Sequence, residues 1–128
     1  MIEYTVNVYD GGTKHWYKNG ELHREDGPAV EYVSGTKHWY KNGKLHREDG
    51  PAIEYTDGEK KWCVNGKLHR EDGPACEYAD GDKAWYLNGK EFTEEEFLNK
   101  TKKHTIIING QEIQISEESY KELKESLN

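Results

Sequence analysis

WYKNGKLHREDGPAIEYTDGEKKW, residues 39–62, is the segment from which the architecture of this chain follows. Its tryptophan recurs every 23 residues, and its octapeptide LHREDGPA recurs unchanged at the same interval. A fixed period of this size predicts a linear array, in which each unit buries apolar surface only against its neighbours. The recurring positions are Trp16, Trp39, Trp62 and Trp85, the Asn-Gly pairs that begin at Asn19, Asn42, Asn65 and Asn88, and the octapeptides that begin at Leu22, Leu45 and Leu68.

Each unit is predicted to form two linked β-hairpins. Asn-Gly between short alternating runs is the strongest local hairpin signal, because both residues accept the positive φ of a type I′ turn. The second turn falls at Ser34-Gly35 and at its equivalents in the later units, Asp57-Gly58 and Asp80-Gly81. The proline of Asp-Gly-Pro-Ala cannot donate a ladder hydrogen bond, so we expect that segment at a strand start or a sheet edge.

A two-residue turn at both positions predicts the cross-strand register. Around Asn42-Gly43, Trp39 is expected opposite His46. Around Ser34-Gly35, Val30 is expected opposite Trp39 and Glu31 opposite His38. The pairs on each side of a turn then determine which side chains share a face of the sheet.

The fourth unit indicates which face is buried. Phe92 stands there in place of the unit histidine, so the tryptophan side stays apolar where the sequence drifts. We therefore expect the tryptophan side to form the core, with His23, His46 and His69 stacked on the indoles. The expected buried face holds Val30, Trp39 and His46, and the expected exposed face holds Glu31, His38, Tyr40 and Arg47.

Both ends of the chain depart from the repeat. Residues 3–9 predict a strand that supplies half a unit. Thr93–Glu96 reads as a capping box before a helix over about 94–102, and a hairpin at Asn109-Gly110 precedes a helix over about 117–127 capped by Ser116. We predict a mainly β fold: a single-sheet, solenoid-like array of antiparallel hairpins over residues 1–92, and a helix–hairpin–helix capping segment over residues 93–128.

Composition argues against several classes of protein. The 128 residues carry a net charge of −7, whereas a protein that binds duplex nucleic acid needs a basic surface. The mean hydropathy is −1.14, and no run approaches the ~18–20 apolar residues of a membrane span. MIEYTVNVYDGG lacks the basic-then-apolar pattern of a signal peptide, so we expect an intracellular protein. Cys63 and Cys76 lack zinc-finger or CxxC spacing and favour packing roles.

The threefold His-Arg-x-Asp pattern raises the question of a metal or catalytic centre. Zinc–ligand bonds are ~2 Å long, whereas equivalent residues two strands apart lie roughly 10 Å apart. An active site also needs distinct groups at one place. We therefore expect no metal, no cofactor and no catalysis, and rank a hydrolase using His46 and Asp49 last. Asp26, Asp49 and Asp72 are interpreted as turn residues whose carboxylates accept backbone N–H bonds.

The arginine row leaves two interpretations open. In the first, each guanidinium pairs with a glutamate across the sheet, an exposed contact worth ~0–1 kcal/mol. In the second, the arginines and nearby tyrosine rings receive carboxylates or a phosphate from a partner. The candidate binding residues are Tyr17, Arg24, His38, Tyr40, Arg47, Lys61 and Arg70.

The unit resembles the MORN-type repeat, which also has 23 residues, an Asn-Gly hairpin and a second turn at Asp-Gly. Over about residues 9–92 it is more similar still to the degenerate MORN-like repeats with an LHRxDGPA core found in bacteriophage and giant-virus proteins. Arg24, Arg47 and Arg70 stand where MORN repeats usually have glycine, so membrane binding is not carried over. The resemblance implies a phage protein that acts in the cytoplasm of a bacterial host.

A non-enzymatic binding module is the function that the sequence favours, because an array of like units presents a periodic surface. With the resemblance, the expected partner is a host protein, such as a defence component that the chain inhibits. The acidic charge favours a basic target or mimicry of nucleic acid. The alternative is a sponge that holds a nucleotide signal in a concave repeat pocket or at the seam of a homodimer. Duplex nucleic acid and membranes are not expected partners.

Overall fold

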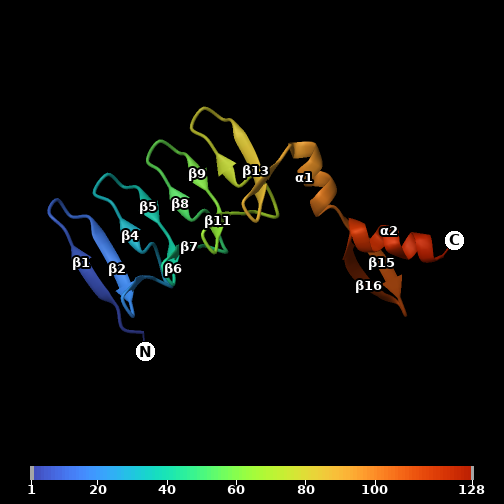
Figure 1. Cartoon of the computed structure of the whole chain (residues 1–128), viewed down its shortest axis with the longest axis horizontal. Coiled ribbons are helices and arrows are strands. Elements are labelled where there is room, and N and C mark those ends of the chain that lie inside the picture. Colours follow the sequence, from blue (N-terminus) through green and yellow to red (C-terminus); the bar gives the residue numbers. More distant parts are fainter. Residues whose placement is uncertain (1, 128) are drawn as a thin grey trace. The chain divides into compact units, whose positions relative to one another are not determined.

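The computed structural model describes residues 2–127 and confirms the predicted fold class (Figure 1). The chain divides into two compact units, Met1–Glu91, here named the array, and Phe92–Asn128, here named the C-terminal unit. Strands dominate the array, and both helices belong to the C-terminal unit. No helix within the described residues is long and apolar enough to cross a membrane.

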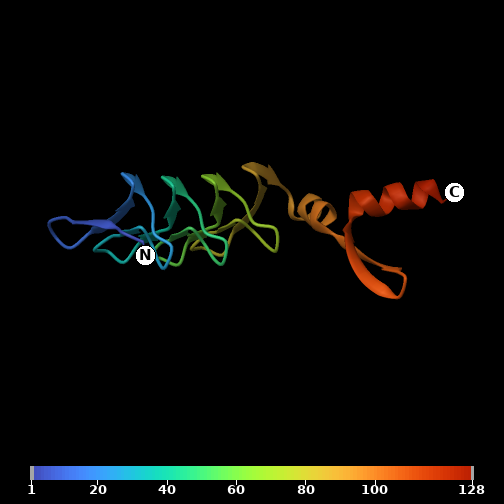
Figure 2. The same cartoon turned by 90° about the horizontal axis from the view of Figure 1, so that it is seen from below.

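The array is built on one ten-stranded antiparallel sheet. The Asn-Gly hairpins of the middle units are separate two-stranded sheets, and Figure 2 shows the Asn-Gly hairpins of successive units side by side, turned out of the plane of the main sheet. The main sheet follows the order β1 (Thr5–Val8), β2 (Lys14–Lys18), β4 (Val30–Glu31), β5 (Lys37–His38), β8 (Ile53–Glu54), β9 (Lys60–Lys61), β12 (Cys76–Glu77), β13 (Lys83–Leu87) and β14 (Lys90–Phe92), with β3 (Glu21–Leu22) paired to β2. The separate hairpins are β6 (Tyr40–Lys41) with β7 (Lys44–Leu45), and β10 (Cys63–Val64) with β11 (Lys67–Leu68).

The register at the Asn-Gly turns is confirmed. Tyr40 pairs with Leu45, and the His46 N–H donates to the Trp39 carbonyl over 3.0 Å. The asparagine at each turn has a φ between 50° and 52°, as a type I′ turn requires.

The register at the second turn is wrong by one residue. Val30 pairs with His38, not with Trp39, and Glu31 pairs with Lys37, not with His38. The loop holds three residues, not two, between Tyr32 and Thr36, whose backbones are joined by a 2.9 Å hydrogen bond from the Tyr32 N–H to the Thr36 carbonyl. Because side chains alternate along a strand, one extra loop residue moves a whole row to the other face.

The shift separates an apolar row from a charged row. His38 lies between Val30 and Ile53 on neighbouring strands, so these three side chains share one face. The adjacent row, on the opposite face, alternates lysine and glutamate across the sheet. Its members are Lys14, Glu31, Lys37, Glu54, Lys60, Glu77 and Lys83.

The core therefore lies elsewhere than predicted. The four tryptophans are only half-buried, so the expectation of a tryptophan core is wrong. Because of the shifted register, the residue that follows each buried alanine pairs across the sheet with His38 or its equivalents and not with a tryptophan. The buried apolar residues of the array are Ala29, Val30, Ala52, Ile53, Cys63, Ala75 and Cys76.

The C-terminal unit forms the predicted helix, hairpin and helix. Thr93 and Glu96 exchange the two hydrogen bonds of a capping box, of 2.9 and 3.1 Å, at the start of α1 (Glu94–Thr101). The hairpin of β15 (Lys103–Ile108) and β16 (Gln111–Ser116) turns at Asn109-Gly110, and α2 (Glu117–Ser126) follows with Ser116 as its N-cap.

Candidate functional site

Each LHREDGPA segment folds its arginine over the tryptophan of the same unit. The guanidinium carbon lies 4.0 Å from the ring centroid for Arg24 over Trp16, and 3.9 Å for Arg47 over Trp39. Arg70 repeats the stack. At this distance the cation is attracted by the face of the indole. The stack covers the tryptophan rings, which explains why the rings are half-buried without lying in the core.

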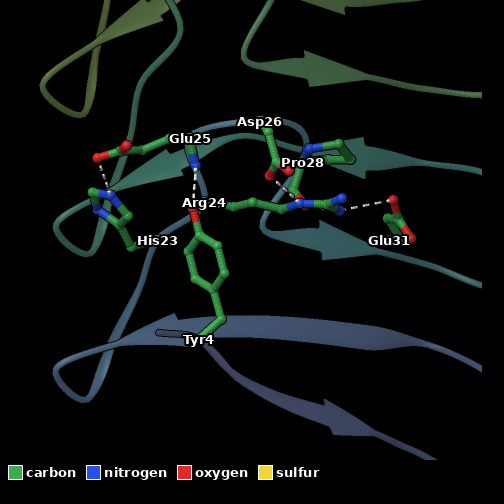
Figure 3. Close-up of polar contacts among 7 residues, drawn as sticks. All are labelled: Tyr4, His23, Arg24, Glu25, Asp26, Pro28 and Glu31. Carbon is green, nitrogen blue, oxygen red and sulfur yellow. Dashed lines mark hydrogen bonds and ion pairs between the residues drawn. The ribbon is translucent and has the colours of Figure 1, made fainter. Parts of the chain in front are cut away.

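The same arginine is held by three further acceptors, which Figure 3 shows for the first unit. Arg24 Nε donates to Asp26 over 2.9 Å, and Nη1 donates to the Pro28 carbonyl over 3.2 Å and to Glu31 over 3.3 Å. The second unit repeats all three contacts, and the third repeats those to the aspartate and the proline. A side chain at Gly50 would collide with the guanidinium, because a Cβ there would lie 2.8 Å from Arg47 Cζ.

These contacts favour the first interpretation of the arginine row, because the guanidinium N–H groups that they use are not available to a partner. Arg24, Arg47 and Arg70 keep 20%, 22% and 22% of their side chains exposed. Arg24 and Arg47 each donate three hydrogen bonds within the unit, and Arg70 donates two. The expectation for the aspartates is corrected as well. Each accepts a hydrogen bond from an arginine Nε two residues earlier, in place of a backbone N–H.

The unit histidines link one unit to the next. His23 Nδ1 accepts the N–H of Asn42 over 2.9 Å, and the same contact recurs 23 and 46 residues later, at 3.0 and 2.9 Å. A neutral ring that accepts at Nδ1 carries its proton at Nε2. In Figure 3, Nε2 of His23 faces Glu25, at 3.3 Å. We expected these rings to stack on indoles; the constant spacing of 19 residues between histidine and asparagine was the sequence signal for the actual contact.

Exposed carboxylates follow the half-buried arginines along the array. Asp26, Asp49 and Asp72 have 75%, 86% and 84% of their side chains exposed. Glu25, Glu48 and Glu71 precede them and are exposed too. These six residues are named the Glu–Asp ridge.

Grooves separate the successive segments of the ridge. The larger, of about 820 Å³, has Trp62 and Val64 in its lining. Its walls carry two arginines and four carboxylates, from Arg47, Glu48, Asp49, Arg70, Glu71 and Asp72. The smaller groove contains Trp39 and lies between the first and second segments. The larger groove has two more carboxylates than arginines, which is an environment for a cation. The smaller groove balances its three carboxylates with Arg24, Lys41 and Arg47.

The other predicted residues gather around His38, on the opposite face of the sheet from the arginines, although Tyr40 also lines the smaller groove. His38 is surrounded by the rings of Tyr32, Tyr40 and Tyr55, at centroid distances of 5.2, 6.3 and 6.4 Å. Burial lowers the pKa of His38, and its Nδ1 is buried without a hydrogen-bond partner. Lys61 lies 5.9 Å from the Tyr55 centroid. We name this surface, made of His15, Tyr17, Tyr32, His38, Tyr40, Tyr55 and Lys61, the His–Tyr face.

The structure thus divides the seven candidate residues. Tyr17, His38 and Lys61 lie on the His–Tyr face, and the three arginines lie on the other side of the sheet, against the tryptophans. Tyr40 approaches His38 with its ring and also lines the smaller groove with Arg24 and Arg47. The shifted second turn is the reason, because it moves His38 away from the row of glutamates that the arginines contact. The ridge itself was not among the predicted binding residues.

Neither cysteine has the character of a reactive thiol. Cys63 and Cys76 are free and buried, and burial raises the pKa of Cys63 to about 11. A thiolate is the reactive form, so both groups are expected to be inert at neutral pH. Among residues 2–127, no group of three or more His, Cys, Asp or Glu side chains is placed to hold a metal ion.

The recurring contacts make the site a row of equivalent positions, at which one chemistry is offered several times. In comparisons with known proteins, no family model matches the chain, and neither do any curated proteins or solved structures.

Proposed function

We propose that the array is a non-enzymatic binding module whose Glu–Asp ridge engages a basic segment of a host protein, and that it acts as a phage-encoded inhibitor of a host defence component. The observation that carries this proposal is the contrast within each segment. The arginine side chain forms contacts within its own unit, whereas the glutamate and aspartate beside it are exposed to solvent.

The spacing of the ridge suits an extended basic peptide. Two strands per unit, ~4.8 Å apart, put equivalent carboxylates roughly 10 Å apart. A chain in the polyproline II conformation rises ~3.1 Å per residue with three residues per turn, so every third side chain would lie on the same side and meet a new Glu-Asp pair. A lysine or arginine at those positions would pair with the exposed carboxylates of the ridge and, in the larger groove, with the four carboxylates of its walls.

The test compares two variants with equal charge loss. The first changes Glu25, Glu48 and Glu71 to Gln, which removes ridge charge and keeps the hydrogen-bond acceptor of His23 Nε2 at residue 25. The control changes Glu112, Glu118 and Glu122 to Gln in the C-terminal unit. Each full-length protein is immobilised and exposed to a bacterial lysate, and bound proteins are identified at low and high salt.

We expect the unaltered chain and the control to capture the same basic protein, with binding that weakens as salt rises, since screening reduces charge attraction. The ridge variant should lose it. Equal capture by the ridge variant, or a captured partner without basic character, would contradict the proposal.

The nucleotide sponge remains a second candidate because of His38. Its buried, unpartnered Nδ1 stands among three tyrosine rings, with Lys61 on the same face, so the His–Tyr face offers stacking surfaces and a cation. Thermal-shift measurements with cyclic and linear nucleotides test it, since a ligand specific for the folded state raises the melting temperature. The expected result is a shift that disappears in Tyr32→Ala and persists in Lys37→Ala on the opposite face. No shift with any nucleotide would rule the sponge out.

A further inference from the structure

The C-terminal unit leaves nearly all of its apolar side chains in contact with solvent. No residue of β15, β16 or α2 is buried, and Phe97 of α1 is the only buried residue described between 92 and 127. A segment below ~40 residues rarely holds a stable fold without disulfides, metals or association with another chain. An isolated two-stranded hairpin is also marginal in water.

Contacts between α2 and the hairpin are confined to one end. The rings of His104 and Tyr120 stack at 3.8 Å. The first residue of α2, Glu117, accepts a hydrogen bond from His104 and lies 4.0 Å from the Lys102 amine. The other hydrogen bonds described between α2 and residues 102–116 also lie at this end: the backbone bond from Glu117 to Lys102, and the two bonds of Ser119 with the N-cap Ser116. Figures 1 and 2 show α2 and the hairpin diverging beyond this common base.

The strand face beneath α2 becomes apolar towards the tip of the hairpin. His104 pairs with Ile115 and Ile106 with Ile113, so these side chains and Ile108 share the face that meets Tyr120. On α2, the stripe of Tyr120, Leu123 and Leu127 faces the same way by helical spacing. The exposed members form what we name the C-terminal patch: Ile108 (49%), Ile113 (39%), Leu123 (39%) and Leu127 (78%).

The helix of the same chain cannot cover the tip of its own hairpin. Ser116 is both the last residue of β16 and the N-cap of α2, so no linking residue allows the helix to lie back along the strands. The apolar halves of the patch, one on the strands and one on the helix, therefore stay apart in one copy.

We propose that the C-terminal patch binds a second copy of this chain in a two-fold symmetric dimer. In such an interface residue i of one copy meets residue j of the other and the reverse, so the helix half of each patch covers the strand half of the other. The charges of α2 agree with an antiparallel approach. Glu117 and Lys124 lie two turns apart on the same side of the apolar stripe, and the symmetry brings Lys124 of one helix towards Glu117 of the other.

Sedimentation equilibrium of the full chain tests this inference. We expect a mass of twice 14.9 kDa at concentrations above ~10 µM. Leu123→Glu and Ile113→Lys should each raise the dimer dissociation constant by at least ~10-fold. Ile107→Lys is the matched control, because Ile107 is 70% exposed on the other face of β15 and should leave the dimer intact.

Mixing separates a broken interface from a broken fold. Leu123→Glu and Ile113→Lys, each monomeric alone, should form a heterodimer when combined, because the new charges attract across the symmetry axis. Four results would overturn the inference: a monomeric unaltered chain, dimeric patch variants, an equal loss with Ile107→Lys, or no heterodimer on mixing. A monomer would instead indicate that another protein covers the patch. The Glu–Asp ridge plays no part in this contact, so the two proposals fail independently.

Discussion

The array and the C-terminal unit use the same Asn-Gly turn, with asparagine φ values between 50° and 52° at all five positions. Three of the four turns in the array, those at Asn42, Asn65 and Asn88, are hydrogen-bonded to the preceding unit. At Asn42-Gly43, the asparagine N–H donates to His23 and the glycine N–H donates to the Leu22 carbonyl over 2.9 Å. The turn at Asn109-Gly110 has no equivalent neighbour described within residues 2–127. A hairpin of the same local sequence is thus fixed in one region and left with an exposed apolar face in the other.

Repetition explains how the array holds together with so small a core. Each junction between units adds a hydrogen bond to a histidine and two between backbones, such as Arg24 N–H to the Tyr40 carbonyl. An intramolecular hydrogen bond contributes roughly 1 kcal/mol net. The same bonds recur at every junction, so the stability of the array grows with the number of units. The C-terminal unit has one hairpin and gains nothing of the kind.

The largest effect should follow from enlarging a core alanine. Ala52 is 0% exposed, so Ala52→Leu forces extra atoms into a filled site and should lower the free energy of unfolding by about 3 kcal/mol. Urea unfolding followed by tryptophan fluorescence reports the array alone, because all four tryptophans lie in it. Leu98→Ala, at an exposed position in the C-terminal unit, is the control and should change this transition by less than ~0.5 kcal/mol. Equal effects would remove the distinction between the two regions.

Removing the inter-unit histidines should produce a graded series. His23, His46 and His69 expose 3%, 10% and 18% of their side chains, so the asparagine N–H left unpaired is least accessible to water at the first junction. We expect His23→Ala to cost about 2 kcal/mol, and the other two variants progressively less. His104→Ala in the C-terminal unit should leave the tryptophan-detected transition unchanged. A series in the reverse order would show that these hydrogen bonds do not set the stability of the junctions.

A smaller loss of stability should follow when an arginine loses the separate N–H donors of its guanidinium group. Arg47→Lys keeps a charge near Trp39 but cannot reproduce the separate bonds of Nε to Asp49 and Nη1 to Pro51, so we expect a cost of about 1 kcal/mol. Arg47→Met separates packing from charge, since it keeps a long side chain over the indole. If lysine were as stable as arginine by urea unfolding, these separate donors would contribute no stability.

Local signals in the sequence predict the turns and helix starts of this chain better than they predict which side chains share a face of the sheet. Asn-Gly gave the first turn and its register correctly, and Thr93 and Ser116 marked both helix starts. Ser34-Gly35 was read as a two-residue turn, although a three-residue loop with glycine at its end has nearly the same sequence. The extra loop residue puts His38 on the other face of the sheet, and the core forms around the buried alanines and the residues that follow them.

The candidate site was recognised only in part, for a related reason. The seven predicted binding residues are cationic, histidine or tyrosine side chains, and the structure places three of them, the arginines, in contacts within their own units. Sequence alone does not show that Arg24 bends back to Asp26 and Pro28, because this fold-back depends on the turn conformation at Gly27. The exposed carboxylates of the ridge become apparent only when the arginines are known to be occupied.

The smallest effects concern pH and should separate the two regions by the acidity at which each weakens. Burial lowers the pKa of His38 from 6.5, so the folded array favours the neutral ring. The unfolded chain then takes up a proton first as pH falls below 6.5, and the array loses stability from there down to the lower folded pKa. In the C-terminal unit, the hydrogen bond from His104 lowers the pKa of Glu117 from 4.5. The stability that the charged Glu117 contributes is complete above pH 4.5 and is lost as the pH falls through the lower pKa of Glu117 in the folded state.

An acid titration followed by two signals tests both windows. Tryptophan fluorescence in moderate urea should decline below pH 6.5, and His38→Gln should flatten that decline. Circular dichroism of the helices should hold until below pH 4.5, and Glu117→Gln should remove the later change without affecting the earlier one. If His38→Gln altered the helix signal, or if both signals fell at one pH in the unaltered chain, the two units would not titrate independently. The array weakens first because its sensitive group is a ring that must stay neutral, whereas the C-terminal unit depends on a carboxylate that must stay charged.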